Sequence, residues 1–358
     1  MSNPDRTTVR LIAAALTSSW RSDRTPLDLT VSELSSITPM LVQSGAAGLV
    51  WWRAQLSDLR DSKPAQFLRR AFRSQVLQAV LREQELAHLF ASLRCAGVEP
   101  ILVKGWAIAR LYPEKGLRPQ GDIDLIVGPH QLSDAYAVLR TPDCEGYQVD
   151  LDHREFHRLD ARALDGLYAR SRLIDDGNVP VRILGAEDHL SFLCRHSLRH
   201  SACRPLWLCD IAAELEARPP DFDWDLILRN RQQRDYVETA VSLAHSLIGA
   251  RLDDTPFASK SGKLPRWLIP AVLRQWENSD PMAHAPFNHL KPMGSYVRNP
   301  SGFLKGLIAR WPDPIQATVT IGAPFNQVPR LPFQVGECML RAMKALPIAS
   351  EAARPAED

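Results

Sequence analysis

The sequence has no run of apolar residues long enough to cross a membrane. Its longest candidates, Leu11–Leu16 and Gly45–Trp52, are far shorter than the roughly 18 residues that a membrane-spanning helix needs. The first residues also lack the basic and apolar regions of a secretory signal. We therefore expect a cytoplasmic protein that has no membrane partner.

Paired cysteines and excess charge are also missing. Six cysteines are spread over 358 residues and none forms a Cys-x-x-Cys pair, which is typical of reduced thiols rather than of a disulfide framework. The 43 basic and 41 acidic residues leave a net charge of only +2. Such a charge provides no long-range attraction for nucleic acid, although it is compatible with a local basic site. We expect no strong general nucleic-acid binding.

Proline is abundant but unevenly placed, since 14 of the 27 prolines lie from Arg251 onward. Because proline interrupts helices and central strands, this third predicts only short helices, such as Ile269–Trp276 and Phe303–Trp311. The shifts in composition divide the chain into four expected regions. These are a helical region at 1–96, an α/β core at 97–184, a second helical region at 185–250 and a proline-rich extension at 251–358.

The hydrophobic pattern changes from helical to strand-like near Gly97. Upstream, apolar residues three and four apart between Pro64 and Cys95 predict a long helix that Gly97 ends. Downstream, short apolar runs bounded by glycine and proline predict strands. The expected strands are Val98–Val103, Asp122–Val127, Tyr147–Asp152 and Val179–Leu184, with helices at Trp106–Tyr112 and Gln131–Arg140. The pattern favours a small sheet flanked by helices.

Two carboxylates, Asp122 and Asp124, share one face of the strongest expected strand. Neighbouring carboxylates repel each other, and a divalent cation removes that repulsion. Mg²⁺ takes one or two protein carboxylates together with substrate phosphates. The alternative is a solvated edge strand or an Asx turn, because an isolated Asp-x-Asp is common.

The surroundings of this pair favour a phosphate site. Lys104 and Gly105 stand between a strand and a helix, where a backbone turn and a point charge can meet an anion. Arg118 precedes Asp122 by four residues, and Asp150 and Asp152 share a face of the next strand. Carboxylates beside a phosphate cradle are typical of metal-assisted phosphoryl or nucleotidyl transfer.

These segments resemble a known family. Lys104-Gly105-Trp-Ala-Ile-Ala-Arg-Leu-Tyr-Pro and Leu-Arg118-Pro-Gln-Gly-Asp122-Ile-Asp124-Leu-Ile-Val are similar to the uncharacterised bacterial nucleotidyltransferases of the DNA polymerase β superfamily. Toxin-type nucleotidyltransferases share a similar Lys-Gly…Arg…Asp-Ile-Asp arrangement. The resemblance continues into Glu-Asp-His-Leu at 187–190 and Arg-Pro-Leu-Trp-Leu-Cys-Asp at 204–210, and covers roughly residues 65–250.

The resemblance implies an α+β fold with a small mixed, polymerase β-like sheet and a helical region at 185–250 that completes the active-site cleft. It also implies that Asp122, Asp124 and a third acid, Asp150 or Asp152, hold Mg²⁺ or Mn²⁺. Lys104, Gly105 and Arg118 would contact the nucleotide. Two departures stand out: Trp106 replaces the glycine or serine usual in the superfamily, and Asp-Leu-Asp-His at 150–153 replaces Asp-Leu-His.

A second polar group lies in the helices after the core. His196, Arg199 and Arg204 are candidates for contacting the nucleotide or the acceptor, with Asp210 orienting one of them. The alternative is that they are packed or solvated helix residues. Cysteines at 194 and 203 flank two histidines and could suggest a zinc site, but the Cys-x-His-x-x-x-His-x-x-Cys spacing matches no common zinc site.

The leading hypothesis is a metal-dependent nucleotidyltransferase. It would move a nucleoside monophosphate from a nucleoside triphosphate to an acceptor hydroxyl or amine and release pyrophosphate. The acceptor is not identified by the sequence, and a small molecule, a peptide or protein, or an RNA remains open. The alternatives are a toxin-like transferase that acts on tRNA and a non-catalytic nucleotide sensor.

Overall fold

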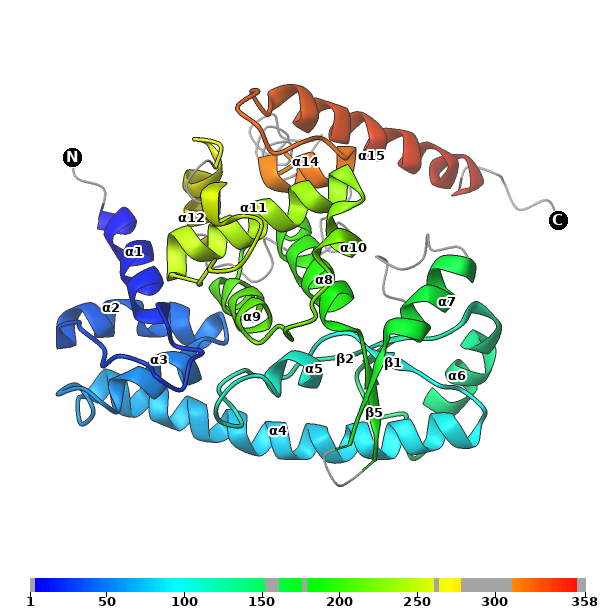
Figure 1. Ribbon diagram of the computed structural model, residues 1–358, viewed down its shortest axis with the longest axis horizontal. Helices are drawn as coiled ribbons and strands as arrows, with labels where there is room; N and C mark the ends of the chain where they lie inside the picture. Colours follow the sequence, from blue (N-terminus) through cyan, green and yellow to red (C-terminus); the bar gives the residue numbers. More distant parts are fainter. Residues whose placement is uncertain (1–3, 152–160, 176–178, 261–263, 278–310, 353–358) are drawn as a thin grey trace.

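The computed structural model describes residues 4–151, 161–175, 179–260, 264–277 and 311–352. Within these residues it is a helical protein that contains one five-stranded sheet (Figure 1). All six cysteines are free thiols. No helix in these ranges combines the length and the apolar character needed to span a membrane.

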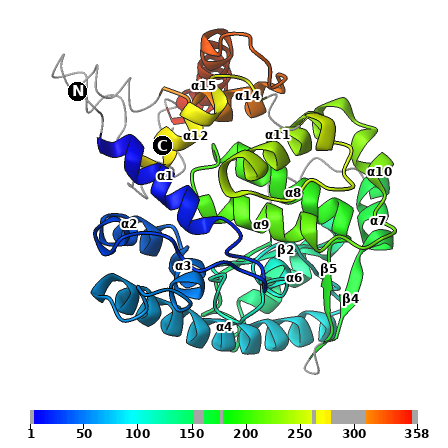
Figure 2. The ribbon, with the colours of Figure 1, turned by 60° about the vertical axis from the view of Figure 1, so that its left-hand side comes forward.

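Four helices form the N-terminal part, and the first three gather over one end of the fourth, which is the longest (Figure 2). They are α1 (Pro4–Leu16), α2 (Val31–Gln43), α3 (Ala47–Ala54) and α4 (Lys63–Cys95). The sequence prediction for α4 is confirmed: Ser62 accepts a hydrogen bond from the Ala65 N–H, and Pro64 lies in the first turn. Gly97 follows the last turn with φ +77°, a conformation in which glycine avoids the steric cost of a side chain.

The sheet has the strand order β3-β2-β1-β5-β4. Its strands are β1 (Ile101–Leu102), β2 (Ile123–Ile126), β3 (Val149–Asp150), β4 (Arg172–Ile174) and β5 (Val181–Ile183). The β1–β2 and β4–β5 pairs are antiparallel, whereas β1–β5 and β2–β3 are parallel. The mixed sheet and the α+β class agree with the sequence expectation, but each expected strand is longer than the paired segment, and β4 was not expected.

The two faces of the sheet pack in different clusters. Leu102 and Leu125 join the apolar face of α4 in one cluster, and α4 runs beneath the sheet in Figure 1. Ile101 and Ile126 join a larger cluster on the opposite face, together with residues of the helices that follow the sheet. Because side chains alternate along a strand, Asp124 lies on the same face as Ile126, away from α4.

Short helices connect the strands. They are α5 (Trp106–Ala109), the 3₁₀ turn η1 (Pro129–Gln131), α6 (Leu132–Leu139) and α7 (Ala161–Arg170). The segment expected as a helix to Tyr112 continues beyond Ala109 as turns, so α5 is only one turn long. The helix expected at Gln131–Arg140 is present as η1 and α6.

In the described part of the chain, eight further elements follow the sheet. They are α8 (Ala186–Arg199), α9 (Pro205–Glu216), α10 (Trp224–Leu228), α11 (Arg231–Ile248), η2 (Ala258–Lys260), α12 (Leu268–Glu277), α14 (Pro314–Ile321) and α15 (Leu331–Ala352). The helix expected at Ile269–Trp276 is α12, whereas most of the one expected at Phe303–Trp311 lies outside the described residues. The expectation of only short helices is wrong for α15: Pro332 occupies its first turn, where proline is tolerated, and the helix continues past Pro347 to Ala352.

Candidate functional site

The register of β2 and β3 brings two predicted site residues together. Asp124 of β2 is directly opposite Asp150 of β3 in the parallel pair, so both carboxylates lie on the same face of the sheet. Asp122 lies two residues before Asp124, just ahead of the strand. The side chain of Asp124 is buried with 2% of the residue exposed, whereas Asp122 and Asp150 are exposed. The buried acid thus sits between two acids that solvent can reach.

Asp124 is electrostatically strained by its position. The pKa of its carboxyl group is raised from 3.8 to about 6: burial is the largest cause, the charge of Lys104 lowers the pKa, and the charges of Asp150 and Asp122 add to the rise. The Lys104 Nζ lies 2.9 Å from the Asp124 Oδ1. Among the described residues, Lys104 therefore supplies a counter-charge in direct contact with the buried carboxylate.

Lys104 is held against Asp124 by the turn after β1. Gly105 has φ +66° and ψ −114°, a conformation that residues with a side chain rarely adopt. A Cβ at Gly105 would meet only the Asp122 carbonyl oxygen, at 3.7 Å, so backbone conformation and not crowding requires the glycine. The Val103 N–H donates to the Asp124 carbonyl at 3.0 Å and ties this turn to β2.

The donor chemistry of this group fits a hard divalent ion, because Mg²⁺ and Mn²⁺ prefer carboxylate oxygens, and Mg²⁺ is usually bound by one or two of them together with substrate phosphates. In the described ranges no three His, Cys, Asp or Glu side chains lie close enough together to hold an ion as they stand. Asp122 and Asp150 are exposed, so their side chains can turn toward Asp124 without disturbing the core. Asp152, the other predicted third acid, lies outside the described residues.

Arg118 has a different environment from the one that the sequence predicts. Its Nε and Nη2 donate to Asp210 at 3.3 and 3.1 Å, and its Nη1 donates to the Pro119 carbonyl at 2.8 Å. Tyr112 also donates to Asp210, at 2.7 Å, and burial and the Asp210 charge raise the pKa of that hydroxyl so that it stays a donor. All three side chains are buried. A phosphate contact for Arg118 stays a prediction, and its evident role is to fix the segment that leads to Asp122.

A family model described as an uncharacterised nucleotidyltransferase matches residues 32–252. The match covers more than half of the 358 residues. The chain belongs to this nucleotidyltransferase family. Comparisons with curated proteins and with solved structures found no match. The family region begins earlier than the expected residue 65, so α2, α3 and the start of α4 belong to it, and it ends close to the expected residue 250.

In this nucleotidyltransferase, Asp210 does not orient the residues that the sequence assigned to it. Its contacts are to Arg118 and Tyr112 and not to His196, Arg199 or Arg204, because α9 turns Asp210 toward the segment before β2. No local pattern in the sequence indicates this pair, since Asp210 and Arg118 are 92 residues apart in sequence and only the fold brings them together.

His196 belongs to a ring cluster between α8 and α9 of the nucleotidyltransferase. Its ring centroid lies 5.7 Å from that of Phe192, 4.7 Å from that of His200 and 4.9 Å from that of Trp207. The Arg204 guanidinium lies over the Trp207 ring at 5.5 Å. The cluster passes from the buried His196 to the exposed His200 and Arg204, while Arg199 is half-buried. Contact of these residues with the nucleotide or the acceptor stays a prediction.

Sequence reasoning missed a buried histidine–glutamate pair on the same two helices. The His189 Nδ1 lies 2.8 Å from the Glu214 Oε2, and both residues are almost fully buried. His189 falls inside the Glu-Asp-His-Leu segment that carried the family resemblance. In the sequence, only its helical spacing from other apolar residues indicates that it is buried. The pair joins α8 to α9 and stabilises the wall opposite the sheet.

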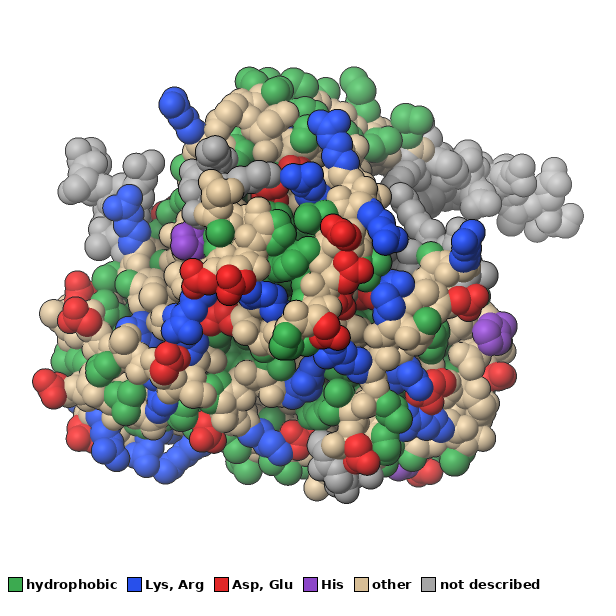
Figure 3. Space-filling view, viewed as in Figure 1, with side chains coloured by type: hydrophobic (Ala, Val, Ile, Leu, Met, Phe, Trp, Pro, Cys, Tyr) green, Lys and Arg blue, Asp and Glu red, His purple; other side chains and the backbone are tan. Residues whose placement is uncertain are grey.

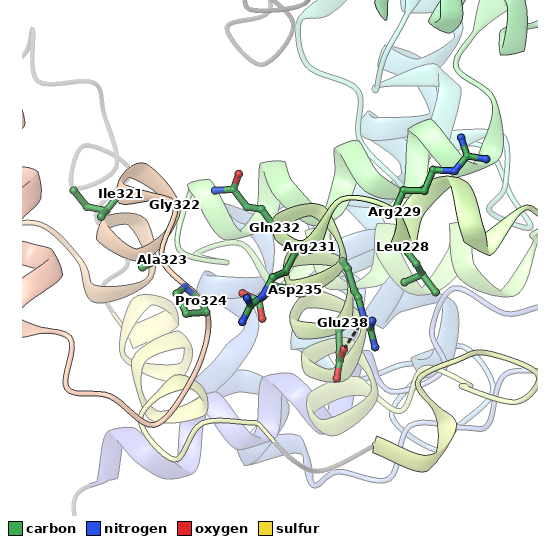
Figure 4. Close-up of a pocket in the computed structure, with 11 residues that line it drawn as sticks. Leu228, Arg229, Arg231, Gln232, Asp235, Glu238, Ile321, Gly322, Ala323 and Pro324 are labelled. Carbon is green, nitrogen blue, oxygen red and sulfur yellow. Dashed lines mark ion pairs between the residues drawn. The ribbon is translucent and has the colours of Figure 1, made fainter.

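An open cavity of about 1070 Å³ lies between the start of α11 and the end of α14 (Figure 4). Arg231 and Asp235 line it from α11, and Gly322 and Pro324 line it from the α14 side. None of its lining residues belongs to the sheet, to the Lys104 turn or to the ring cluster. The cavity is therefore separate from the carboxylates of this nucleotidyltransferase.

Proposed function

We propose that the protein is a metal-dependent nucleotidyltransferase that moves a nucleoside monophosphate from a nucleoside triphosphate to an acceptor hydroxyl or amine. The observation that carries this proposal is the pairing of Asp124 with Asp150 across parallel strands, with Lys104 on the buried member of the pair. Family membership supports nucleotidyl transfer in general. Our proposal goes beyond family membership in three respects: the metal ion, the triphosphate substrate and the class of acceptor.

In the proposed reaction, an acceptor oxygen or nitrogen attacks the α-phosphorus and the bond to the bridging oxygen of pyrophosphate breaks. Mg²⁺ or Mn²⁺, when bound, would neutralise charge on the phosphate oxygens. Asp122, Asp124 and Asp150 would hold the ion, and the exposed Asp150 would also accept the acceptor proton. Lys104 would move to the phosphate oxygens. Such transfer depends mainly on positioning and on stabilising charge.

The surrounding structure supports positioning. The Arg118–Asp210–Tyr112 network holds the segment before Asp122, and the Gly105 turn holds Lys104. Helices α8 and α9 share a cluster with the sheet face that carries Asp124, so they are placed to wall the cleft. These contacts hold the segments that carry Lys104 and Asp122, which supports the proposed positioning of the triphosphate.

The alternative of a tRNA-directed transferase has no specific support. Lys and Arg side chains alternate with Asp and Glu over the face in Figure 3, which shows no continuous basic surface there. Because the net charge is only +2 and this one face carries both signs of charge, we propose small molecules and peptides as the first acceptors to test.

The test is pyrophosphate release from each of the four nucleoside triphosphates with Mg²⁺ or Mn²⁺ and a panel of acceptors. We expect Asp122→Asn and Asp124→Asn to lower the rate at least about 100-fold, because each removes a charge that the metal needs. Asp134→Asn, an exposed carboxylate on α6, is the matched control and should leave the rate unchanged. Release that persists in the double variant would contradict the proposal, and nucleotide binding without turnover would support the sensor alternative.

A further inference from the structure

We propose that Lys104 is a resident counter-cation on Asp124 that a divalent ion has to displace, so that metal binding depends on the triphosphate that receives the lysine. This inference rests on the proposed function, because it concerns the same carboxylates. It adds a coupling between binding of the metal ion and binding of the triphosphate, and it assigns that coupling to the side chain of Lys104.

The geometry places the lysine where a metal ion would bind. The Lys104 Nζ is 2.9 Å from the Asp124 Oδ1, with 25% of the lysine side chain and 3% of the aspartate side chain exposed. A buried carboxylate is costly to ionise unless a cation contacts it. Arg118 also lies within electrostatic reach of Asp124, but Asp210 and the Pro119 carbonyl bind its guanidinium. Lys104 is thus the cation that can leave.

The ammonium group and a divalent ion compete for the same oxygen. Mg²⁺ binds carboxylate oxygens at about 2.0–2.1 Å, a position that a second positive charge 2.9 Å from the same atom opposes by repulsion. Lysine carries its charge on a flexible four-carbon stem, and its partly exposed side chain can swing out of the site. Leaving Asp124 without a new partner for the ammonium group is unfavourable, so the lysine opposes metal binding.

A triphosphate removes that obstacle, because its oxygens offer the ammonium group another anion beside the Gly105 turn. The lysine then moves from Asp124 to phosphate, and the freed carboxylate accepts the metal. Coupling of two ligands is reciprocal, so the metal must also tighten nucleotide binding. The protein would bind the metal ion and the triphosphate tightly when both are present, and it would bind either one only weakly on its own.

A purely structural ion pair makes a different prediction. Removing a structural lysine would destabilise the protein and leave the intrinsic metal affinity unchanged or weaker. Removing a competitor increases that affinity. The sign of the change in metal affinity therefore distinguishes the two roles.

The experiment measures Mn²⁺ binding by calorimetry and by electron paramagnetic resonance, with and without non-hydrolysable analogues of ATP and GTP. We expect Lys104→Met to bind Mn²⁺ at least about tenfold more tightly than the wild type when nucleotide is absent. The further gain on adding the nucleotide analogue should shrink, because the lysine no longer links the two sites. Lys104→Arg, which keeps the positive charge, should stay close to the wild type.

Lys115→Met is the matched control. Lys115 precedes Arg118 by three residues and pairs with Glu83 on the surface, so its loss should not change Mn²⁺ affinity. If Lys104→Met does not fold, Lys104→Gln, which keeps an N–H donor for Asp124, provides the same measurement. Equal or weaker Mn²⁺ binding by the folded Lys104 variant would overturn the inference and leave the proposed function standing. No Mn²⁺ binding by any protein, even with nucleotide, would instead overturn the proposed function.

Discussion

The Arg118–Asp210 pair allows a quantitative test of how the segment before Asp122 is held. Asp210→Ala removes the acceptor of hydrogen bonds from Arg118 and Tyr112. The Arg118 side chain is only 9% exposed, so solvent screens the remaining charge little. Removing one partner of a buried ion pair costs about 3–5 kcal/mol in the free energy of unfolding. With about 2.1 cal/mol/K per residue, 358 residues convert this loss into a fall of about 4–7 °C in melting temperature.

The assay is urea unfolding and thermal melting of four proteins: wild type, Asp210→Ala, Arg118→Met and the double variant Arg118→Met with Asp210→Leu. Replacing both charges by apolar groups leaves no unpaired ion, so the double variant should lose less stability than the sum of the single losses. Lys115→Met, which breaks an exposed pair with Glu83, should cost less than about 1 kcal/mol.

Two results would refute this reasoning. A melting temperature of Asp210→Ala within about 1 °C of the wild type would show that the pair does not stabilise the fold. Unchanged stability of Arg118→Met together with lost nucleotide binding would show that Arg118 acts on phosphate, as the sequence predicts, and not on Asp210.

Three further predictions concern stability without metal. The pKa of Asp124 is raised to about 6 in the folded protein, so protonation of this carboxyl group favours the folded state. The contribution to the free energy of unfolding, about 3 kcal/mol, is present below pH 4 and lost as the pH rises through 6. Urea unfolding of Asp124→Asn should lack this part of the pH dependence. A Cβ at Gly116 (φ +87°) would lie 2.8 Å from the Val76 backbone nitrogen, so Gly116→Ala should lower the free energy of unfolding by about 3–5 kcal/mol. A Cβ at Gly97 would meet nothing within 4 Å, so Gly97→Ala should lower it by about 1 kcal/mol. Equal losses of stability in melting experiments would contradict this. Ending the chain at residue 311 removes Ile315, which is fully buried in the main cluster. Losing such a side chain costs about 2–5 kcal/mol, so we expect a melting temperature about 3–7 °C lower by the same conversion. An unchanged value would show that the segment after residue 311 is dispensable.

The central part of the site was predictable because its signals are local. Asp124 lies in β2 as expected, whereas Asp122 lies just before the strand begins at Ile123, so the shared strand face of the two acids stays a prediction. The match of Asp124 with Asp150 also agrees with the sequence, since the apolar residues around each acid leave few alternative registers. Residues close in sequence and on a regular element could therefore be placed without the structure.

The environment of Arg118 could not be predicted, because its partner Asp210 is 92 residues away. No local pattern distinguishes an arginine that faces phosphate from one that is bound inside the protein. Strand ends were also unpredictable. Val98–Val103 is apolar apart from Glu99, yet only Ile101–Leu102 pairs as β1, because a strand extends only as far as its neighbours do. The edge strand β4 has Leu173 half exposed and lacks a clear apolar face, so it carried no signal.

The position of β1 has a consequence for how the chain folds during synthesis. β1 lies at the middle of the sheet, antiparallel to β2 and parallel to β5. Leu102 pairs with Ile183, so the second half of the sheet cannot close until the intervening residues have left the ribosome. Contacts so distant in sequence slow folding, because the loop between them must be closed first. The acids on β2 and β3 can thus meet on a nascent chain well before β5 and β4 complete the sheet on the other side of β1.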